Sequence, residues 1–402
     1  MHVIPAHQGR PTDDPIFALN REATTRAKAG ESIINATLGA AMDDSGKLAI
    51  LKTAVQAVRE VGEETFAGYA PITGAPAFNN AVMDDLFGDE PELRAAAIAA
   101  ATPGGTGALR HAVCNFLEPG QALLTTNYFW GPYQTIADEA DRKVETFEMF
   151  AADGTFDVGA LDAAIDRQLS TQKRVLLFLN DPCHNPTGFS MHGDEWRKVA
   201  EVLAKHASSG RGSVTLLCDT AYTAYSAGHP RAFLKELRPL LGKVALLFAW
   251  SASKTYTMYG LRVGAIVACI ADEAERKATE AAFAYSCRGT WSNCNHGGLA
   301  AVTRLLTDPA LRSACDAERS VLKDTLFKRV AAFNRAAAPA QLKYPRYEGG
   351  FFVTVFAPDA AERAVRMKEK GVFVVPQKAA LRVALCSVRE ADVERLVDAL
   401  KS

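Results

Sequence analysis

Lys254 is the residue whose type and surroundings most directly suggest chemistry. It follows an apolar run that ends at Trp250, hydroxyl residues flank it, and Arg262 stands a short distance further along. A lysine beside cationic groups in a partly desolvated site has a lowered pKa and becomes a nucleophile that can form a Schiff base. The alternative is a solvated lysine and arginine at two strand ends, and the Ser-Ala-Ser-Lys motif alone does not separate the two.

Groups that bind anions occur beside this lysine and again earlier in the chain. Ser251 and Ser253 supply hydroxyls, and the planar guanidinium of Arg262 can grip a phosphate with two hydrogen bonds. Upstream, a Gly-Gly-Thr-Gly run opens a helical pattern, so the backbone amides of Gly105 and Thr106 could cradle a phosphate at the helix N-terminus. Taken alone, such a turn is more often only the start of a helix.

Other apolar runs lead into side chains that could contact an aromatic ligand. Asp219 ends one run, at the sheet edge where α/β proteins form their sites, although it could simply cap the next helix. A buried carboxylate there could keep a pyridine nitrogen protonated. Asn185 and Tyr222 could hydrogen-bond an oxygen on the same ring. Tyr128 could stack on the ring, but an aromatic at such a place is more often part of the core.

The region from about residue 100 to 270 predicts the larger part of an α/β fold. Apolar runs alternate with amphipathic stretches, the pattern of βαβ units around a mostly parallel central sheet. Continuous apolar character indicates strands buried on both faces. The expected strands are 122–126, 174–180, 213–219, 244–250 and 263–270, and the expected helices are 107–117, 158–168, 193–207 and 272–284.

The last hundred residues predict a smaller α+β unit. A long helical pattern runs from His296 to about Asn334, and a final helix ends the chain. Between them we expect strands at 350–355, 371–376 and 381–386 and a helix at 359–370. With the N-terminal segment added, the prediction is a large domain of residues 46–300 and a small domain of residues 1–45 and 301–402.

Composition narrows the classes of partner. The 402 residues are 48% hydrophobic and 23% charged, which supports a folded core. A net charge of -1 gives no field that attracts nucleic acid or an acidic membrane surface. We find no apolar run of the roughly 18 residues that a membrane span needs and no signal-peptide pattern. Small-molecule partners and a cytoplasmic location are therefore expected.

The cysteines indicate neither disulfides nor a metal site. All eight are scattered through apolar runs with no CxxC spacing. Cys294 and His296 lie close together, but zinc needs a second pair of ligands. We expect most of the cysteines to be reduced core residues and no metal.

The motifs, taken in order, resemble those of fold-type I class I aminotransferases, and most closely the aspartate/aromatic aminotransferase family. The similarity extends from an Asp-Pro-Ile-Phe segment at Asp14 to the C-terminal helix. Each motif alone is weak, but their common order and spacing argue against coincidence. The motifs are Tyr69-Ala-Pro-Ile-Thr-Gly74, GGTGAL, HNPTG, DTAY, SASK, Arg262 and LRVAL.

The resemblance implies pyridoxal 5′-phosphate (PLP) as cofactor and assigns a role to each motif. Lys254 becomes the Schiff-base lysine and the proton shuttle between the substrate Cα and cofactor C4′. Asp219 pairs with the pyridine nitrogen, and Tyr222, the third member of the catalytic set, contacts the 3′-oxygen together with Asn185. Tyr128 takes the ring-stacking position. The residues assigned to the phosphate are Gly105, Thr106, Ser251, Ser253 and Arg262.

The resemblance also implies a homodimer with shared active sites. Tyr69 matches a tyrosine that reaches the phosphate of the neighbouring subunit's cofactor. Arg382 matches the arginine that binds the substrate α-carboxylate, and Gly39 falls on a substrate-contacting position. Arg288 matches an arginine that binds the distal carboxylate of dicarboxylic substrates in the other subunit's site. A surface arginine at a helix end is the alternative for Arg288.

Three departures from the family pattern leave the substrate side chain open. Tyr128 stands where the family has tryptophan, Gly131 where it has a histidine partner of the aspartate, and Trp291 where it has tyrosine. The expected reaction is ping-pong transamination between an aromatic or dicarboxylic amino acid and a 2-oxo acid such as 2-oxoglutarate or oxaloacetate. A PLP-dependent β-lyase or decarboxylase is the first alternative, because the same ring chemistry permits other bonds at Cα to break. A PLP-binding regulatory module is the second.

Overall fold

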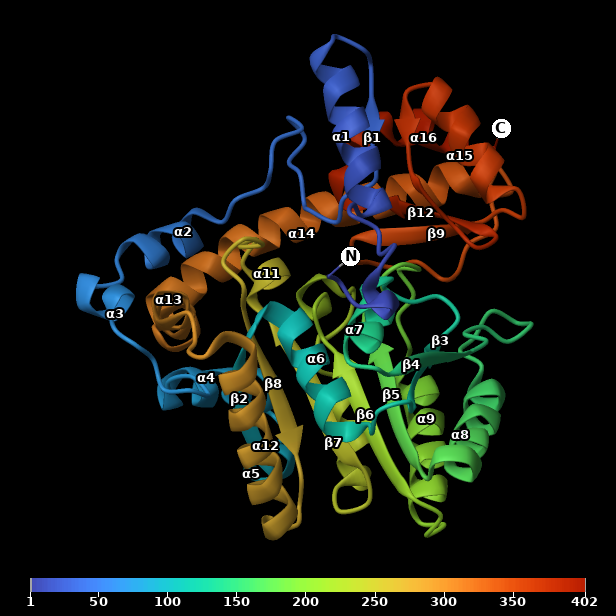
Figure 1. The fold of residues 1–402 in the computed structure, drawn as a ribbon. Helices are drawn as coiled ribbons and strands as arrows, with labels where there is room; N and C mark the ends of the chain where they lie inside the picture. The colour runs from blue at the N-terminus through green and yellow to red at the C-terminus, as the bar shows by residue number, and fades with distance from the viewer. Residues whose placement is uncertain (1, 402) are drawn as a thin grey trace.

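A seven-stranded sheet forms the centre of the computed structural model, which describes residues 2–401 (Figure 1). The strand order is β2-β8-β7-β6-β5-β3-β4. Only β8 runs antiparallel to its neighbours, so the prediction of a mostly parallel sheet is confirmed. The strands are β2 (Ala97–Pro103), β3 (Ala122–Thr126), β4 (Lys143–Phe147), β5 (Arg174–Asn180), β6 (Ser213–Asp219), β7 (Ala245–Ser251) and β8 (Val263–Cys269).

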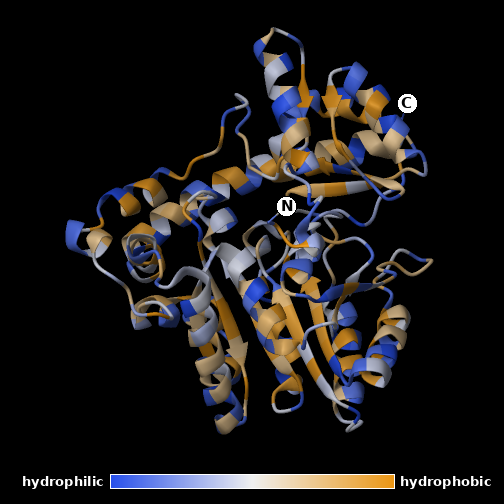
Figure 2. Ribbon diagram, in the orientation of Figure 1, coloured by the Kyte–Doolittle hydropathy of each residue, from blue (hydrophilic) through white to orange (hydrophobic). Residues whose placement is uncertain are grey.

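Helices cover both faces of this sheet because its central strands are apolar on both sides. Alternate residues of a strand point to opposite faces, so Leu177 and Leu216 belong to one core cluster while Leu176 and Leu217 belong to another. The central strands are coloured as hydrophobic along much of their length (Figure 2). The first cluster includes residues of α4 (Pro76–Phe87), α8 (Val158–Gln172), α9 (Gly193–Ala207) and α13 (His296–Thr307), and the second includes residues of α6 (Gly104–Phe116), α7 (Pro132–Glu139) and α12 (Glu273–Trp291).

The structure corrects several predicted boundaries. The helix predicted from residue 107 begins at Gly104, and the helix predicted to end at residue 284 continues to Trp291. The long helical pattern is two helices, α13 and α14 (Pro309–Ala337), because Asp308 caps the second helix and Pro309 begins it. Strands β2 and β4 were not predicted, and the alanine-rich sequence of β2 has only two β-branched residues, Ile98 and Thr102, to signal a strand.

A smaller α+β unit lies above the edge of the sheet in Figure 1. Its antiparallel strands are β11 (Val375–Gln377), β12 (Ala380–Ala384) and β9 (Phe352–Phe356), and its helices include α1 (Pro15–Lys28), α15 (Ala360–Glu369) and α16 (Val393–Leu400). The N-terminal segment joins this unit, because β1 (Ile34–Asn35) pairs with β10 (Val372–Phe373). The core changes partway along α14, since Cys315 belongs to the large core and Leu326 to the small one. The division at residue 300 stays a prediction.

The remaining elements are short. They are η1 (Pro5–His7), α2 (Lys52–Arg59), α3 (Glu63–Ala67), α5 (Pro91–Ala95), η2 (Thr223–Tyr225), α10 (Leu234–Leu237), η3 (Arg238–Leu240), α11 (Ala252–Thr255), η4 (Leu385–Ser387) and η5 (Glu390–Asp392). All eight cysteines are free and seven are buried, as expected for reduced core residues. Among residues 2–401, no helix combines the length and the apolar character that crossing a membrane requires.

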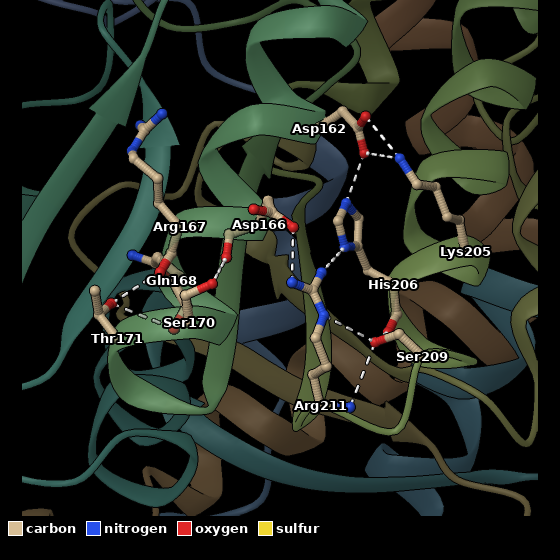
Figure 3. Close-up of polar contacts among 10 residues, drawn as sticks. All are labelled: Asp162, Asp166, Arg167, Gln168, Ser170, Thr171, Lys205, His206, Ser209 and Arg211. Atoms are coloured by element: carbon tan, nitrogen blue, oxygen red, sulfur yellow. Dashed lines mark hydrogen bonds and ion pairs between the residues drawn. The ribbon is translucent and has the colours of Figure 1, made fainter.

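A polar cluster ties α8 to the end of α9 (Figure 3). Asp162 accepts hydrogen bonds from Lys205 at 2.8 Å and from His206 at 2.6 Å. Arg211 pairs with Asp166 at 2.7 Å and lies 3.1 Å from the other ring nitrogen of His206. Because His206 is buried, these contacts satisfy an imidazole that water cannot reach. The cluster therefore joins two covering helices and lines none of the cavities described below.

Arg329 holds the small unit to the N-terminal segment. This α14 side chain is 1% exposed. Its guanidinium donates to the carbonyl oxygens of Cys386 at 2.7 Å and Met42 at 2.8 Å, and it pairs with Asp44 at 2.7 Å. The side chain therefore satisfies two carbonyl oxygens from distant parts of the chain.

Replacing Arg329 with methionine is expected to lower the free energy of unfolding by about 3 kcal/mol, because the carbonyl oxygen of Met42 loses its donor and that of Cys386 keeps only the backbone amide of Met42. Chemical denaturation measures the change. Arg335→Met on the exposed side of the same helix is the matched control and should change stability by less than about 0.5 kcal/mol. Equal stability of the two variants would contradict this role for Arg329.

Candidate active site

A cavity of about 190 Å³ lies at the carboxyl ends of β5, β6 and β7. The C-terminal residues of these strands, Asn180, Asp219 and Ser251, all line it. Every residue predicted to contact a cofactor lines this cavity except Tyr128 and Tyr69. The full lining is Gly105, Thr106, Leu109, Trp130, Asn180, Asn185, Asp219, Ala221, Tyr222, Ser251, Ser253, Lys254 and Arg262.

One end of the cavity is built to hold an anion. Gly104 has φ of +69°, and a Cβ atom there would lie 2.4 Å from the nearest guanidinium nitrogen of Arg262. Glycine thus lets the start of α6 approach the arginine, and the first amides of a helix have no partner inside it. Arg262 donates to the hydroxyl of Ser253 at 3.3 Å and to the carbonyl of Tyr259 at 2.9 Å, which fixes its orientation. A phosphate group fits this set of donors.

Lys254 lies on the one-turn helix α11, directly after β7. Its amine is over the rings of Tyr222 and Tyr259, at 5.5 and 6.0 Å from the ring centres. Desolvation lowers the pKa of Lys254 and nearby Arg262 lowers it too, while the carboxylate of Asp219 acts in the opposite direction. A larger share of the amine is therefore neutral and nucleophilic than for an exposed lysine.

Asp219 is buried at the end of β6 and receives two hydrogen bonds. The hydroxyl of Tyr133 donates to it at 2.8 Å, and the backbone amide of Ala221 donates at 3.2 Å. Burial raises the pKa of Asp219, and both hydrogen bonds favour the carboxylate. Burial and the neighbouring Asp219 hold the pKa of Tyr133 well above its usual value, so this phenol remains a donor. The sequence prediction did not include Tyr133.

Trp130, and not Tyr128, is the aromatic side chain that lines the cavity. Tyr128 packs instead against Phe150 and Phe356, with ring centres 6.3 and 5.7 Å apart. Tyr128 was predicted to stack on a ligand ring, but it does not line the cavity, whereas Trp130, two residues later, does. The sequence has Gly131, which caps α7, where a partner of Asp219 was expected, and Tyr133, also two residues later, donates to Asp219.

The spacing of Trp130 and Tyr133 is the signal that could have located them. Trp130 lies two residues before Pro132, the first residue of α7, Tyr133 directly follows Pro132, and their rings meet edge to face at 5.9 Å. In this chain, the aromatic pair on either side of the helix-starting Pro132 therefore indicates the cavity wall better than Tyr128, the first aromatic residue after β3.

Asn185 and Tyr222 contact each other in the wall of the cavity. The amide of Asn185 donates to the hydroxyl of Tyr222 at 3.2 Å, and both residues are buried. The amide oxygen of Asn185 is buried without a protein partner. A buried polar atom left unpaired by the protein is expected where a ligand contributes hydrogen bonds.

Arg382 is a buried guanidinium that lacks a carboxylate partner among the described residues. It stacks on Phe352 at 4.9 Å and donates to the carbonyl of Thr37 at 2.6 Å, while its Nε atom is unpaired. Phe352 in turn lies 5.7 Å from the ring of Tyr222, which connects Arg382 to the cavity. A Cβ atom at Gly39 would lie 2.4 Å from Phe352, so only glycine fits there. The free donors of Arg382 suit an incoming carboxylate.

Tyr69 and Arg288 are the predicted residues that lie on the surface, outside the cavity lining. Tyr69 is 91% exposed. Arg288 is exposed at the end of α12 and donates to the hydroxyl of Ser292 at 3.0 Å. Their assigned roles in a second subunit's site remain predictions.

The geometry describes an α/β enzyme whose lysine can bond to a carbonyl compound beside an anion site. Comparison with known proteins identifies it further: the chain belongs to the family described as aminotransferase class I and II, which matches residues 31–400. It is an aminotransferase, and its fold is the α/β fold of that class.

Relatives match nearly the whole chain. An aspartate aminotransferase of Pseudomonas aeruginosa is 27% identical, with 96% of each chain covered. An aromatic-amino-acid aminotransferase of Paracoccus denitrificans is 28% identical over 78% of each chain. The crystal structure of an aminotransferase from Anaerococcus prevotii has a TM-score of 0.94 at 31% identity, with 100% of this chain and 98% of that chain covered.

Arg262→Met tests the anion site. The substitution removes a charge and a pair of N–H donors, so inorganic phosphate should bind the cofactor-free protein at least about tenfold more weakly. Isothermal titration calorimetry measures this affinity. Arg167→Met removes the same charge from an exposed ion pair on α8, outside the cavity lining, and its phosphate affinity should match that of the parent protein. Unchanged phosphate binding by the Arg262 variant would exclude this residue from the anion site.

Proposed function

We propose that this aminotransferase uses PLP, held at Lys254, to transfer the amino group of an aromatic or dicarboxylic amino acid to a 2-oxo acid. The observation that carries the proposal is the placement of a partly desolvated lysine amine between a buried carboxylate and an anion cradle, in one cavity. Membership of the aminotransferase family supports the same cofactor.

The lining residues match the polar groups of PLP one by one. Asp219 would pair with the ring nitrogen, and Asn185 and Tyr222 would contact the 3′-oxygen. Trp130 replaces Tyr128 as the residue proposed to lie against the ring, because it lines the cavity. The phosphate would bind Gly105, Thr106, Ser251, Ser253 and Arg262. When bound, the protonated ring withdraws electrons from the bonds at the substrate Cα.

Lys254 is proposed to act as the base that removes the proton from the substrate Cα. Its lowered pKa leaves a free amine that can accept this proton. Tyr225 holds the segment by donating to the backbone carbonyl of Lys254 at 3.1 Å. The same amine would return the proton to the adjacent carbon of the cofactor, C4′, so Lys254 serves as both base and acid.

Arginines are proposed to select the substrate. Arg382 would bind the α-carboxylate through the donors that the protein leaves unpaired, with Gly39 allowing close approach. Arg288 would bind the distal carboxylate of a dicarboxylic substrate in the partner's site. The relatives include both aspartate and aromatic aminotransferases, which supports a pocket for either kind of side chain.

A homodimer with shared active sites is part of the proposal. The nearly complete exposure of Tyr69 and the exposure of Arg288 leave both side chains free to reach a second subunit. We also propose a cytoplasmic location, which the soluble amino acid and 2-oxo acid substrates favour.

A half-reaction screen tests the function. The PLP-loaded protein is mixed with single amino acids and the visible absorbance of the bound cofactor is followed while the 2-oxo acid product is measured. Aspartate, glutamate or an aromatic amino acid should give one equivalent of 2-oxo acid without an acceptor, and Lys254→Ala should give none. Continuous release of pyruvate and ammonia from a β-substituted amino acid would favour a lyase, and no conversion of any amino acid would reject the proposal.

Tyr133→Phe tests the support of Asp219. Loss of the hydrogen bond raises the pKa of this carboxyl further, so the carboxylate needed by the ring nitrogen forms only at higher pH. The acid limb of the half-reaction rate should move up by about one pH unit, and the cofactor should dissociate more readily. Tyr128→Phe removes a hydroxyl outside the cavity and should leave the profile in place. An unmoved acid limb in the Tyr133 variant would contradict this assignment.

A further inference from the structure

A second cavity, of about 390 Å³, lies behind the segment that carries Lys254. It is bounded by the end of α4, by residues 220–234, by the end of β7 and by the first half of α14. Ser251 is the lining residue that it shares with the cofactor cavity. Thr220 and Thr255, the neighbours of Asp219 and Lys254 in the chain, also line it. Residues from the two segments that carry Asp219 and Lys254 therefore line both cavities.

Basic side chains outnumber acidic ones around this second cavity. Four cations, Arg231, Arg312, Arg319 and Lys323, face only two carboxylates, Asp85 and Asp316. Lys323 has no carboxylate partner among residues 2–401, and its amine lies over the ring of Phe327 at 5.3 Å. Because these groups are partly withdrawn from water, their mutual repulsion is screened less than on an open surface. The cavity thus carries an uncompensated positive charge.

Asp85 orients two of the arginines. It accepts from Arg231 at 3.2 Å and from Arg312 at 3.4 Å, and it also accepts from the indole of Trp250 at 3.0 Å. A planar guanidinium has five N–H donors, so one contact with Asp85 leaves most of them available to a ligand. The contacts with Asp85 therefore orient the N–H donors of both guanidinium groups in the absence of a ligand.

The rest of the lining is apolar or hydroxylic. Buried Phe233, Leu234 and Trp250 form an apolar wall. Ser320 adds a hydroxyl that can donate to an anion, whereas the hydroxyl of Thr223 already donates to the carbonyl of Thr220 at 2.8 Å. Apolar walls with a few convergent charged groups are the usual character of small-molecule sites.

We propose that this cavity is a second binding site, for a small organic anion that carries at least two negative charges as carboxylate or phosphate groups. Because the lining has two more basic than acidic side chains, a ligand with at least two negative charges would balance it. The apolar wall can contact the carbon skeleton of such a ligand. The site goes beyond the substrate and cofactor positions, and its test rests on the proposed function only in using PLP to fill the cofactor cavity.

The site is also joined to the catalytic segment. Arg319 pairs with Asp316 and donates to the backbone carbonyl of Thr255 at 3.4 Å. The hydroxyl of Thr255 donates to the carbonyl of Ser251 at 3.2 Å. An anion that binds Arg319 therefore contacts the residue that holds the end of α11, one position after Lys254.

Calorimetric titration of the PLP-loaded protein with citrate and, separately, with inorganic phosphate tests the proposal. Loading with PLP fills the anion cradle of the cofactor cavity, so that phosphate cannot bind there. We expect saturable binding of at least one probe, and the tighter of the two identifies carboxylate or phosphate as the preferred group. Lys323→Ala should weaken that binding about tenfold. Its thermal stability should be unchanged, because the lysine has no ion pair to lose.

A matched control separates this site from the active site and from general charge effects. Arg167→Gln removes one positive charge from an exposed ion pair on α8, outside the lining of either cavity, and should bind the probe as the parent protein does. Arg312→Gln should weaken binding as Lys323→Ala does. Absence of saturable binding, or equal affinity in the parent protein and both cavity variants, would overturn the proposal. The second result would place the probe elsewhere, for example at Arg382.

Discussion

The site depends on holding one lysine amine, partly out of water, where a carboxylate and a guanidinium act on it in opposite directions. Desolvation and Arg262 disfavour the charged amine, and Asp219 favours it. The balance requires that the three groups reach one cavity from separate strands. The parallel sheet achieves this because Asp219 and Ser251 end adjacent strands and the antiparallel β8 begins just after Arg262.

A second constraint joins this lysine to the small unit. The residues before Met42 form a strap between the two: Thr37 accepts a hydrogen bond from Arg382, and the amide of Ala41 donates to the hydroxyl of Tyr259 at 3.0 Å. Tyr259 lies beside the amine of Lys254, so the groups proposed to bind the α-carboxylate and to move the proton are both linked to this strap. Gly39 lies within the strap, where its lack of a side chain lets Phe352 pack closely.

The central strands and most lining residues could be predicted because buried parallel strands have continuous apolar sequences and their ends carry the polar motifs. Two kinds of feature were not predicted from the sequence. The alanine-rich β2 becomes a strand only by pairing with β8, a tertiary effect that local propensity does not contain. Trp130 and Tyr133 depend on how the chain turns from β3 into α7, which the apolar pattern does not determine, so their spacing around Pro132 is the signal for them. Tyr69 and Arg288 are exposed and do not line the cavity of their own chain, so the roles proposed for them require a second chain.

The pKa of the Lys254 amine tests the central claim most directly. Cofactor-free protein can be acetylated briefly over a range of pH, and mass spectrometry of the peptide that contains Lys254 then gives the pH at which its reactivity is half-maximal. The exposed lysines of the same sample serve as the internal reference. The account predicts a midpoint below the ordinary lysine value of 10.5. A midpoint at or above that value would mean that desolvation and Arg262 do not outweigh Asp219, and would contradict the account.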